Sequence, residues 1–182
     1  MLILLAITFL VIFFAVILIL LTNIATAKNI PGTSKNDNLT GTIDNDQING
    51  GNGNDTIDGL AGNDLINGDN GYDIIIGSEG DDYLTGGKNN DTIHGDLGND
   101  QIEGNTGGDN ITGDDGDDTL IGGSGDDFLS GGEGNDNLFG GPHDDVLYGG
   151  NGSDYFDCGL GKDKVQDFKS TEGDSRSANC EP

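Results

Sequence analysis

The sequence predicts an all-β solenoid, a coil of short parallel strands, that follows one N-terminal hydrophobic helix. Three observations support this fold class. An uncharged apolar stretch occupies residues 2–21, a nine-residue pattern repeats without insertion or deletion over residues 32–166, and the composition is unsuited to an ordinary globular core. The chain has 182 residues, of which 34 are glycine and none is tryptophan. Apolar burial alone is therefore not expected to fold it.

The charge balance excludes nucleic acid as a partner. The chain carries 33 acidic against 7 basic residues, a net charge of −26, whereas a phosphate backbone needs a basic face. Composition alone would suggest a disordered, low-complexity acidic chain that needs no metal. Low complexity does not hold one register over so many periods, so a repeat architecture is the better interpretation.

Residues 1–27 are predicted to be a signal peptide or a membrane anchor. As a helix, residues 2–21 would span about 30 Å, the thickness of a bilayer's hydrocarbon core. Ala25-Thr26-Ala27 fits cleavage by signal peptidase before Lys28, which favours removal. The apolar stretch is long for a signal peptide and no Lys or Arg precedes it, so a retained anchor is the alternative. Both interpretations place the remaining chain outside the cytoplasm, secreted or anchored at the cell surface.

After a predicted linker at residues 28–31, the nine-residue unit begins at Gly32 and occurs 15 times. Position one is Gly except in the last unit, where it is Cys158, and position eight is always large and apolar. Position six is aspartate in every unit: Asp37, Asp46, Asp55, Asp64, Asp73, Asp82, Asp91, Asp100, Asp109, Asp118, Asp127, Asp136, Asp145, Asp154 and Asp163. This set contains the candidate metal ligands.

Each unit is predicted to form a turn of six residues followed by a strand of three, as in residues 50–58. Glycines at positions one and four permit positive φ and a tight turn. In the strand, position eight points into the interior while positions seven and nine point outward. If two units make one turn of the coil, alternate units form two facing sheets, and the aspartates stack in a column along each edge.

Stacked carboxylates about 4.8 Å apart would repel one another, and a divalent cation between successive turns would reverse that repulsion. Ca²⁺ suits such a site because it accepts six to eight carboxylate and carbonyl oxygens. Seven interturn gaps in one column and six in the other allow at most about 13 ions for 15 units. Lys35 and His143 replace glycine at position four, so their units are the least suited, and the strongest run is expected from Asp55 to Asp136. An EF-hand is excluded because no Glu stands twelve residues into a loop that starts with Asp.

The nonapeptide Gly-Gly-x-Gly-x-Asp-x-U-x, where U is a large apolar residue, resembles the RTX, or hemolysin-type, calcium-binding repeat. The resemblance implies a right-handed parallel β-roll (β-solenoid) of 15 nonapeptide repeats over residues 32–166, with Ca²⁺ between turns 18 residues apart. The entropic cost of ordering this chain exceeds what one buried side chain per unit offsets. We therefore expect folding to be coupled to Ca²⁺ binding.

Residues 167–182 are predicted to be a C-terminal cap or tail, since a solenoid needs its exposed end closed. The segment around Val165 and Phe168 is the expected cap. In an exported protein, Cys158 and Cys180 are expected to form a disulfide.

The predicted function is that of an extracellular, non-catalytic calcium-binding module. Many proteins with this repeat carry a catalytic domain, but this chain has no room for one and contains neither HExxH nor GxSxG, so we expect no enzyme. The alternative is a calcium-dependent adhesin or interaction module with an unknown protein or cell-surface partner. It would use two outward apolar patches, one of Phe128, Val146 and Tyr148 and one of Ile121, Phe139 and Tyr155. Membrane contact is expected only through residues 2–21.

Overall fold

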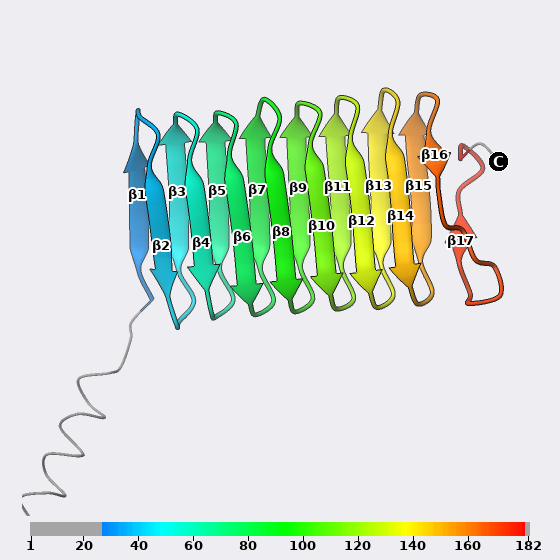
Figure 1. Cartoon of the computed structure of the whole chain (residues 1–182), viewed down its shortest axis with the longest axis horizontal. Helices are drawn as coiled ribbons and strands as arrows, with labels where there is room; N and C mark the ends of the chain where they lie inside the picture. The colour runs from blue at the N-terminus through cyan, green and yellow to red at the C-terminus, as the bar shows by residue number, and fades with distance from the viewer. Residues whose placement is uncertain (1–26, 181–182) are drawn as a thin grey trace, which may run out of the picture.

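A computed structural model describes residues 27–180, in which all regular secondary structure is β-strand (Figure 1). The predicted hydrophobic helix, and with it the choice between signal peptide and anchor, lies outside these residues. Within residues 27–180, no helix has the length and apolar character needed to cross a membrane. The described chain forms a parallel β-solenoid of about eight turns, which confirms the predicted all-β fold class.

The strands alternate between two facing sheets, and those of one sheet run opposite to those of the other (Figure 1). The odd-numbered sheet holds β1 (Asn29–Thr33), β3 (Gln47–Asn52), β5 (Leu65–Asn70), β7 (Tyr83–Lys88), β9 (Gln101–Thr106), β11 (Thr119–Ser124), β13 (Asn137–Pro142), β15 (Tyr155–Leu160) and β17 (Ser175–Arg176). The even-numbered sheet holds β2 (Asn38–Thr42), β4 (Thr56–Leu60), β6 (Ile74–Glu79), β8 (Thr92–Leu97), β10 (Asn110–Asp115), β12 (Phe128–Glu133), β14 (Val146–Asn151) and β16 (Lys164–Val165).

Neighbouring strands within each sheet are parallel and, along the repeats, displaced by 18 residues. Gln47 pairs with Leu65 and Ile48 with Ile66, for example. Two nonapeptides therefore make one turn of the coil, as the repeat predicted. The constant displacement brings equal repeat positions side by side, so any side chain type that recurs every nine residues becomes a ladder along one face.

The division of each unit into turn and strand differs from the prediction. Most strands are six residues long and run from position seven through position three of the next unit, as in Gln47–Asn52. Positive φ occurs at positions two and four, as at Gly51 (99°) and Gly53 (120°), and not at position one. The expected six-residue turn is wrong because the chain stays in the sheet ladder past position one, where backbone groups find partners in neighbouring turns.

The ends of the roll also add to the sheets. Residues 28–31, expected as a linker, include the start of β1, which pairs with β3. The reason is that Ile30 stands nine residues before Leu39, at position eight of an incomplete unit, and packs against the core. At the other end, β17 pairs with β15, and Phe168 lies against Phe156 with ring centroids 6.2 Å apart.

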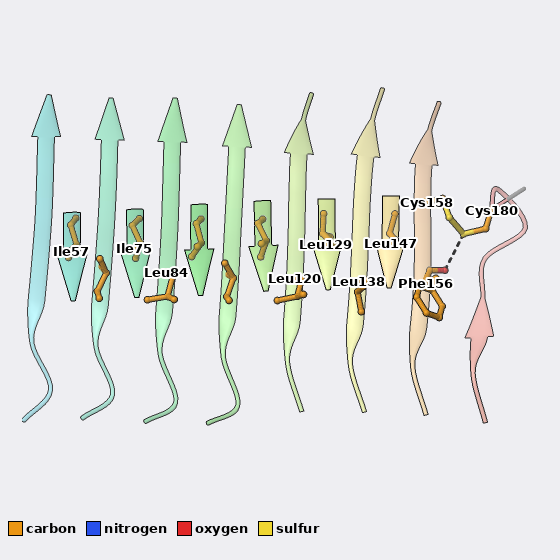
Figure 2. Close-up of a cluster of buried hydrophobic side chains, with 14 of the residues drawn as sticks. Ile57, Ile75, Leu84, Leu120, Leu129, Leu138, Leu147, Phe156, Cys158 and Cys180 are labelled. Carbon is orange, nitrogen blue, oxygen red and sulfur yellow. Dashed lines mark hydrogen bonds between the residues drawn. A yellow bond between two sulfur atoms is a disulfide. The ribbon is translucent and has the colours of Figure 1, made fainter. Parts of the chain in front are cut away.

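Position-eight side chains from both sheets fill the narrow interior (Figure 2). From Ile48 to Phe156 each is at most 1% exposed. The predicted disulfide between Cys158 and Cys180 is confirmed, with Cα atoms 5.1 Å apart, and it ties the tail to the last turns. Each strand of the repeats thus contributes one position-eight side chain to a core that is continuous along the roll.

Two adjacent isoleucines test the inward direction of position eight. Ile75 is 0% exposed and Ile74 is 45% exposed. We predict that Ile75→Ala lowers the free energy of unfolding by about 2–5 kcal/mol because it leaves a cavity. Ile74→Ala, the matched control, should change it by less than about 1 kcal/mol. Denaturant unfolding of both variants measures the difference, and equal losses would contradict the assigned faces.

Candidate metal-binding columns

The position-six aspartates form two columns, one along each edge of the roll. The residues preceding even-numbered strands are Asp37, Asp55, Asp73, Asp91, Asp109, Asp127, Asp145 and Asp163. The residues preceding odd-numbered strands are Asp46, Asp64, Asp82, Asp100, Asp118, Asp136 and Asp154. All except Asp37 are buried, with 0–6% of each residue exposed, whereas Asp37, in the first turn, is half-buried. The aspartates are therefore stacked in two columns, as the repeat predicted.

In every column aspartate except Asp37, one carboxylate oxygen accepts a backbone N–H from the residue 18 positions earlier. Asp100 donates its backbone N–H to Oδ1 of Asp118 at 2.7 Å, 18 residues further on. The same bond recurs at 2.7–3.0 Å from the pair Asp37 and Asp55 to the pair Asp145 and Asp163. Each column is thus a continuous hydrogen-bonded series that fixes the orientation of its carboxylates.

The other oxygen, Oδ2, is buried without a hydrogen-bond partner throughout the middle of the roll. This holds for Asp55, Asp64, Asp73, Asp82, Asp91, Asp100, Asp109, Asp118, Asp127, Asp136, Asp145 and Asp154. A buried carboxylate oxygen with no partner is unfavourable, and a row of them is rare in a folded protein. Such a row indicates that a positively charged group belongs beside it.

Position-one glycine gives these oxygens their space. A Cβ added to Gly50 would lie 2.6 Å from Oδ2 of Asp55 and 2.7 Å from the carbonyl oxygen of Gly68 in the next turn. Any side chain at this position would therefore clash with both oxygens. The expected role of this glycine, a positive φ, is wrong; it is required because carboxylate and carbonyl oxygens converge on it.

The donor set fits Ca²⁺. Hard carboxylate and carbonyl oxygens are its preferred ligands in proteins, and the orphaned Oδ2 atoms supply the charge that a cation would balance. Neither histidine nor cysteine stands at position six, so the columns lack the softer ligands typical of zinc. The residues present therefore suit a hard divalent cation.

The first turn and the tail depart from the regular pattern. Oδ2 of Asp37 accepts hydrogen bonds from the backbone N–H and the hydroxyl of Thr33, so it is not orphaned. In the His143 unit, expected to be weak, His143 adopts positive φ (91°) and Oδ2 of Asp145 is orphaned as in the other units. In the tail, Oδ1 of Asp174 accepts from the N–H of Asp154 at 3.2 Å and so extends that column. Sequence reasoning missed Asp174 because it lies 20 residues on and outside the repeat.

Burial raises the pKa of the column aspartates well above the ordinary value of 3.8. The pKa is about 7 for Asp91, Asp100, Asp118, Asp127 and Asp136 and about 6 for Asp64, Asp73 and Asp145. Desolvation is the largest cause, and neighbouring carboxylates add to it. The backbone N–H that each carboxylate accepts lowers the pKa in part. With protein groups alone around them, these carboxylates keep their protons to a higher pH than an ordinary aspartate does.

Comparison with known proteins identifies the repeat. A family model described as the RTX calcium-binding nonapeptide repeat, in four copies, matches residues 31–66, 67–102, 94–129, 103–138 and 130–165. The matches together span nearly the whole solenoid. No curated protein matches the chain.

The raised pKa values predict that acid favours the metal-free roll. A carboxyl whose pKa rises from 3.8 unfolded to about 7 folded holds its proton longer in the folded state, so stability is greatest at low pH and falls as the pH rises towards 7. Far-UV circular dichroism in chelator should show more β-structure at about pH 5 than at about pH 8.

High salt at the higher pH is the control, because it screens surface charges but not buried columns. It should not reproduce the effect of acid. A β-signal that is independent of pH, or stronger at the higher pH, would contradict the assignment of buried carboxylates.

Proposed function

Because the chain belongs to the family of RTX calcium-binding nonapeptide repeat proteins, we propose that it is an extracellular, non-catalytic module whose aspartate columns bind Ca²⁺ and whose folding depends on that binding. The observation that carries this proposal is the row of buried Oδ2 atoms without partners. In this account the ligands come from position-six carboxylates and from backbone carbonyls of adjacent turns. A bound cation supplies the positive charge that these oxygens otherwise lack.

The electrostatic situation supports coupled folding. Each column stacks like charges in a buried environment, so ionised columns oppose the folded state near neutral pH. A divalent cation removes this penalty and replaces the proton that would otherwise neutralise the carboxylate. Extracellular modules commonly bind Ca²⁺ at about 10⁻⁴–10⁻³ M. The chain would therefore remain unfolded in the cytoplasm and fold after export.

Two features support the extracellular location. The Cys158–Cys180 disulfide is typical of an oxidising compartment, and residues 2–21 are apolar and uncharged. Cleavage before Lys28 would give a secreted module, and retention would give one anchored at the cell surface. N-terminal sequencing of the exported protein separates the two, since the first residue is Lys28 after cleavage and Met1 in a retained chain.

The non-catalytic part of the proposal rests on the sequence, which lacks HExxH and GxSxG. Its two histidines, His94 and His143, both lie within the repeats. The RTX roll is itself a structural calcium-binding fold. We therefore propose that the calcium-bound roll acts through its stiffness and its negative charge and does not catalyse a reaction.

An interaction function is the second candidate, and one aromatic pair favours it. Phe128 is 39% exposed and its ring centroid lies 5.4 Å from that of Tyr148 on the next turn of the even-numbered sheet. Adjacent aromatic rings on an outer face can dock a partner. If this pair is the docking surface, Phe128→Thr, which places a residue found at the same repeat position in Thr119, should abolish Ca²⁺-dependent binding to cells. Retained binding would exclude this surface.

Two adjacent aspartates provide the direct test of the columns. Asp118 is 0% exposed and its Oδ2 has no partner, whereas Asp117 is exposed and accepts from the N–H of Asn135. We predict that Asp118→Asn lowers the number of Ca²⁺ ions bound by one or two, as measured by titration calorimetry, because two interturn sites share this carboxylate.

Asp117→Asn is the matched control. It removes the same charge, and Asn99 and Asn135 already occupy this repeat position in the adjacent turns. The calcium stoichiometry should be unchanged. An equal reduction in both variants would mean that calcium responds to net charge, and an unchanged stoichiometry in Asp118→Asn would contradict the proposed ligands.

A further inference from the structure

We propose a second kind of metal site, one for a borderline divalent metal such as Zn²⁺, on the outer face of the even-numbered sheet at His94, Asp96 and Asp114. One ligand atom from each of these three half-buried residues lies within 4.8 Å of the other two. Among residues 27–180, they are the one group of three or more His, Cys, Asp and Glu side chains arranged in this way. The site is separate from the calcium columns.

The sheet register brings the three side chains together. Asp96 on β8 pairs with Asp114 on β10, and His94 pairs with Thr112 two residues earlier in both strands. Positions nine and two lie on the same outward face because the position-one residue between them points inward. His94 Nδ1 lies 3.5 Å from Oδ2 of Asp114. The ligands therefore come from two neighbouring turns of a rigid ladder.

The electrostatics favour a cation at this place. A metal-bound imidazole is neutral and metal-bound carboxylates are ionised, so the three ligands would carry a net charge of −2, which a divalent metal balances. A groove of about 340 Å³, lined in part by Asp96 and Asp114, leaves room for the water that completes coordination.

The ligand type distinguishes this site from the columns. Imidazole with carboxylates suits Zn²⁺ and similar metals, whereas Ca²⁺ takes oxygen ligands almost alone. Gly95, between His94 and Asp96, faces inward toward the carboxylate of Asp100. Consequently the proposed site and the calcium column lie on opposite sides of the same strand and can be tested independently.

The experiment titrates the Ca²⁺-saturated full chain with Zn²⁺ by calorimetry and with Co²⁺ by visible absorption, which reports a nitrogen ligand. We expect one ion to bind in excess Ca²⁺. His94→Thr and Asp114→Gly should each weaken this binding by more than about tenfold, the scale of losing a metal-site contact. Both replacements occur naturally at equivalent places in adjacent turns, at Thr112 and Gly132, so each variant should keep its fold, which circular dichroism checks.

Two controls are matched to these variants. Asp69→Gly removes a carboxylate from the odd-numbered sheet. Asp69 has the same repeat position as Asp114 and, like Asp114, a positive φ. His143→Asn removes the other histidine, and Asn89 already adopts positive φ at the same repeat position. Both controls should bind Zn²⁺ as the unmodified chain does. Absence of Zn²⁺ binding, binding that survives His94→Thr, or equal losses in the controls would overturn the proposal.

Discussion

The structure depends on one arrangement, a buried aspartate whose two carboxylate oxygens are in different environments. Oδ1 accepts the N–H of the aspartate one turn earlier, as Asp118 does from Asp100 at 2.7 Å. Oδ2 is left without a partner beside an inward-facing glycine. The first interaction sets the 18-residue turn, and the second creates a demand for positive charge that no side chain of the column meets. The membership of this chain in a calcium-binding family is consistent with that demand.

The roll separates a constrained interior from a permissive exterior. Position six holds a carboxylate, position eight holds one apolar side chain, and position one is a glycine with no room for a Cβ in every unit except the last, where it is Cys158. Positions seven and nine point outward, and there the chain places unlike groups such as His94 and Tyr148. The interior is therefore alike in the turns between the two ends, whereas individual turns can acquire their own surface chemistry. The proposed Zn²⁺ site and the aromatic pair at Phe128 are both examples of outward variation on a fixed frame.

Much of this architecture could be predicted because it follows from the period. A nine-residue repeat with one apolar position fixes two facing sheets, an inward position eight and stacked aspartates. The two cysteines predicted the disulfide because the chain was expected to be exported. The strand boundaries could not be predicted, because glycine is as compatible with a sheet ladder as with a turn. The role of position-one glycine could not be predicted either, because it depends on a carbonyl oxygen from the next turn and on the carboxylate of its own unit. Asp174 and Ile30 were missed because each extends the pattern beyond its regular copies.

The most direct test is far-UV circular dichroism of the chain during a Ca²⁺ titration near neutral pH, with Mg²⁺ as the control. Mg²⁺ requires near-ideal octahedral geometry and gives up its water reluctantly, so it should not replace Ca²⁺ in interturn sites. The account predicts a coil-to-β transition at about 10⁻⁴–10⁻³ M Ca²⁺ and none with Mg²⁺. Full β-structure that persists in chelator at this pH would contradict the claim that the cation completes the columns.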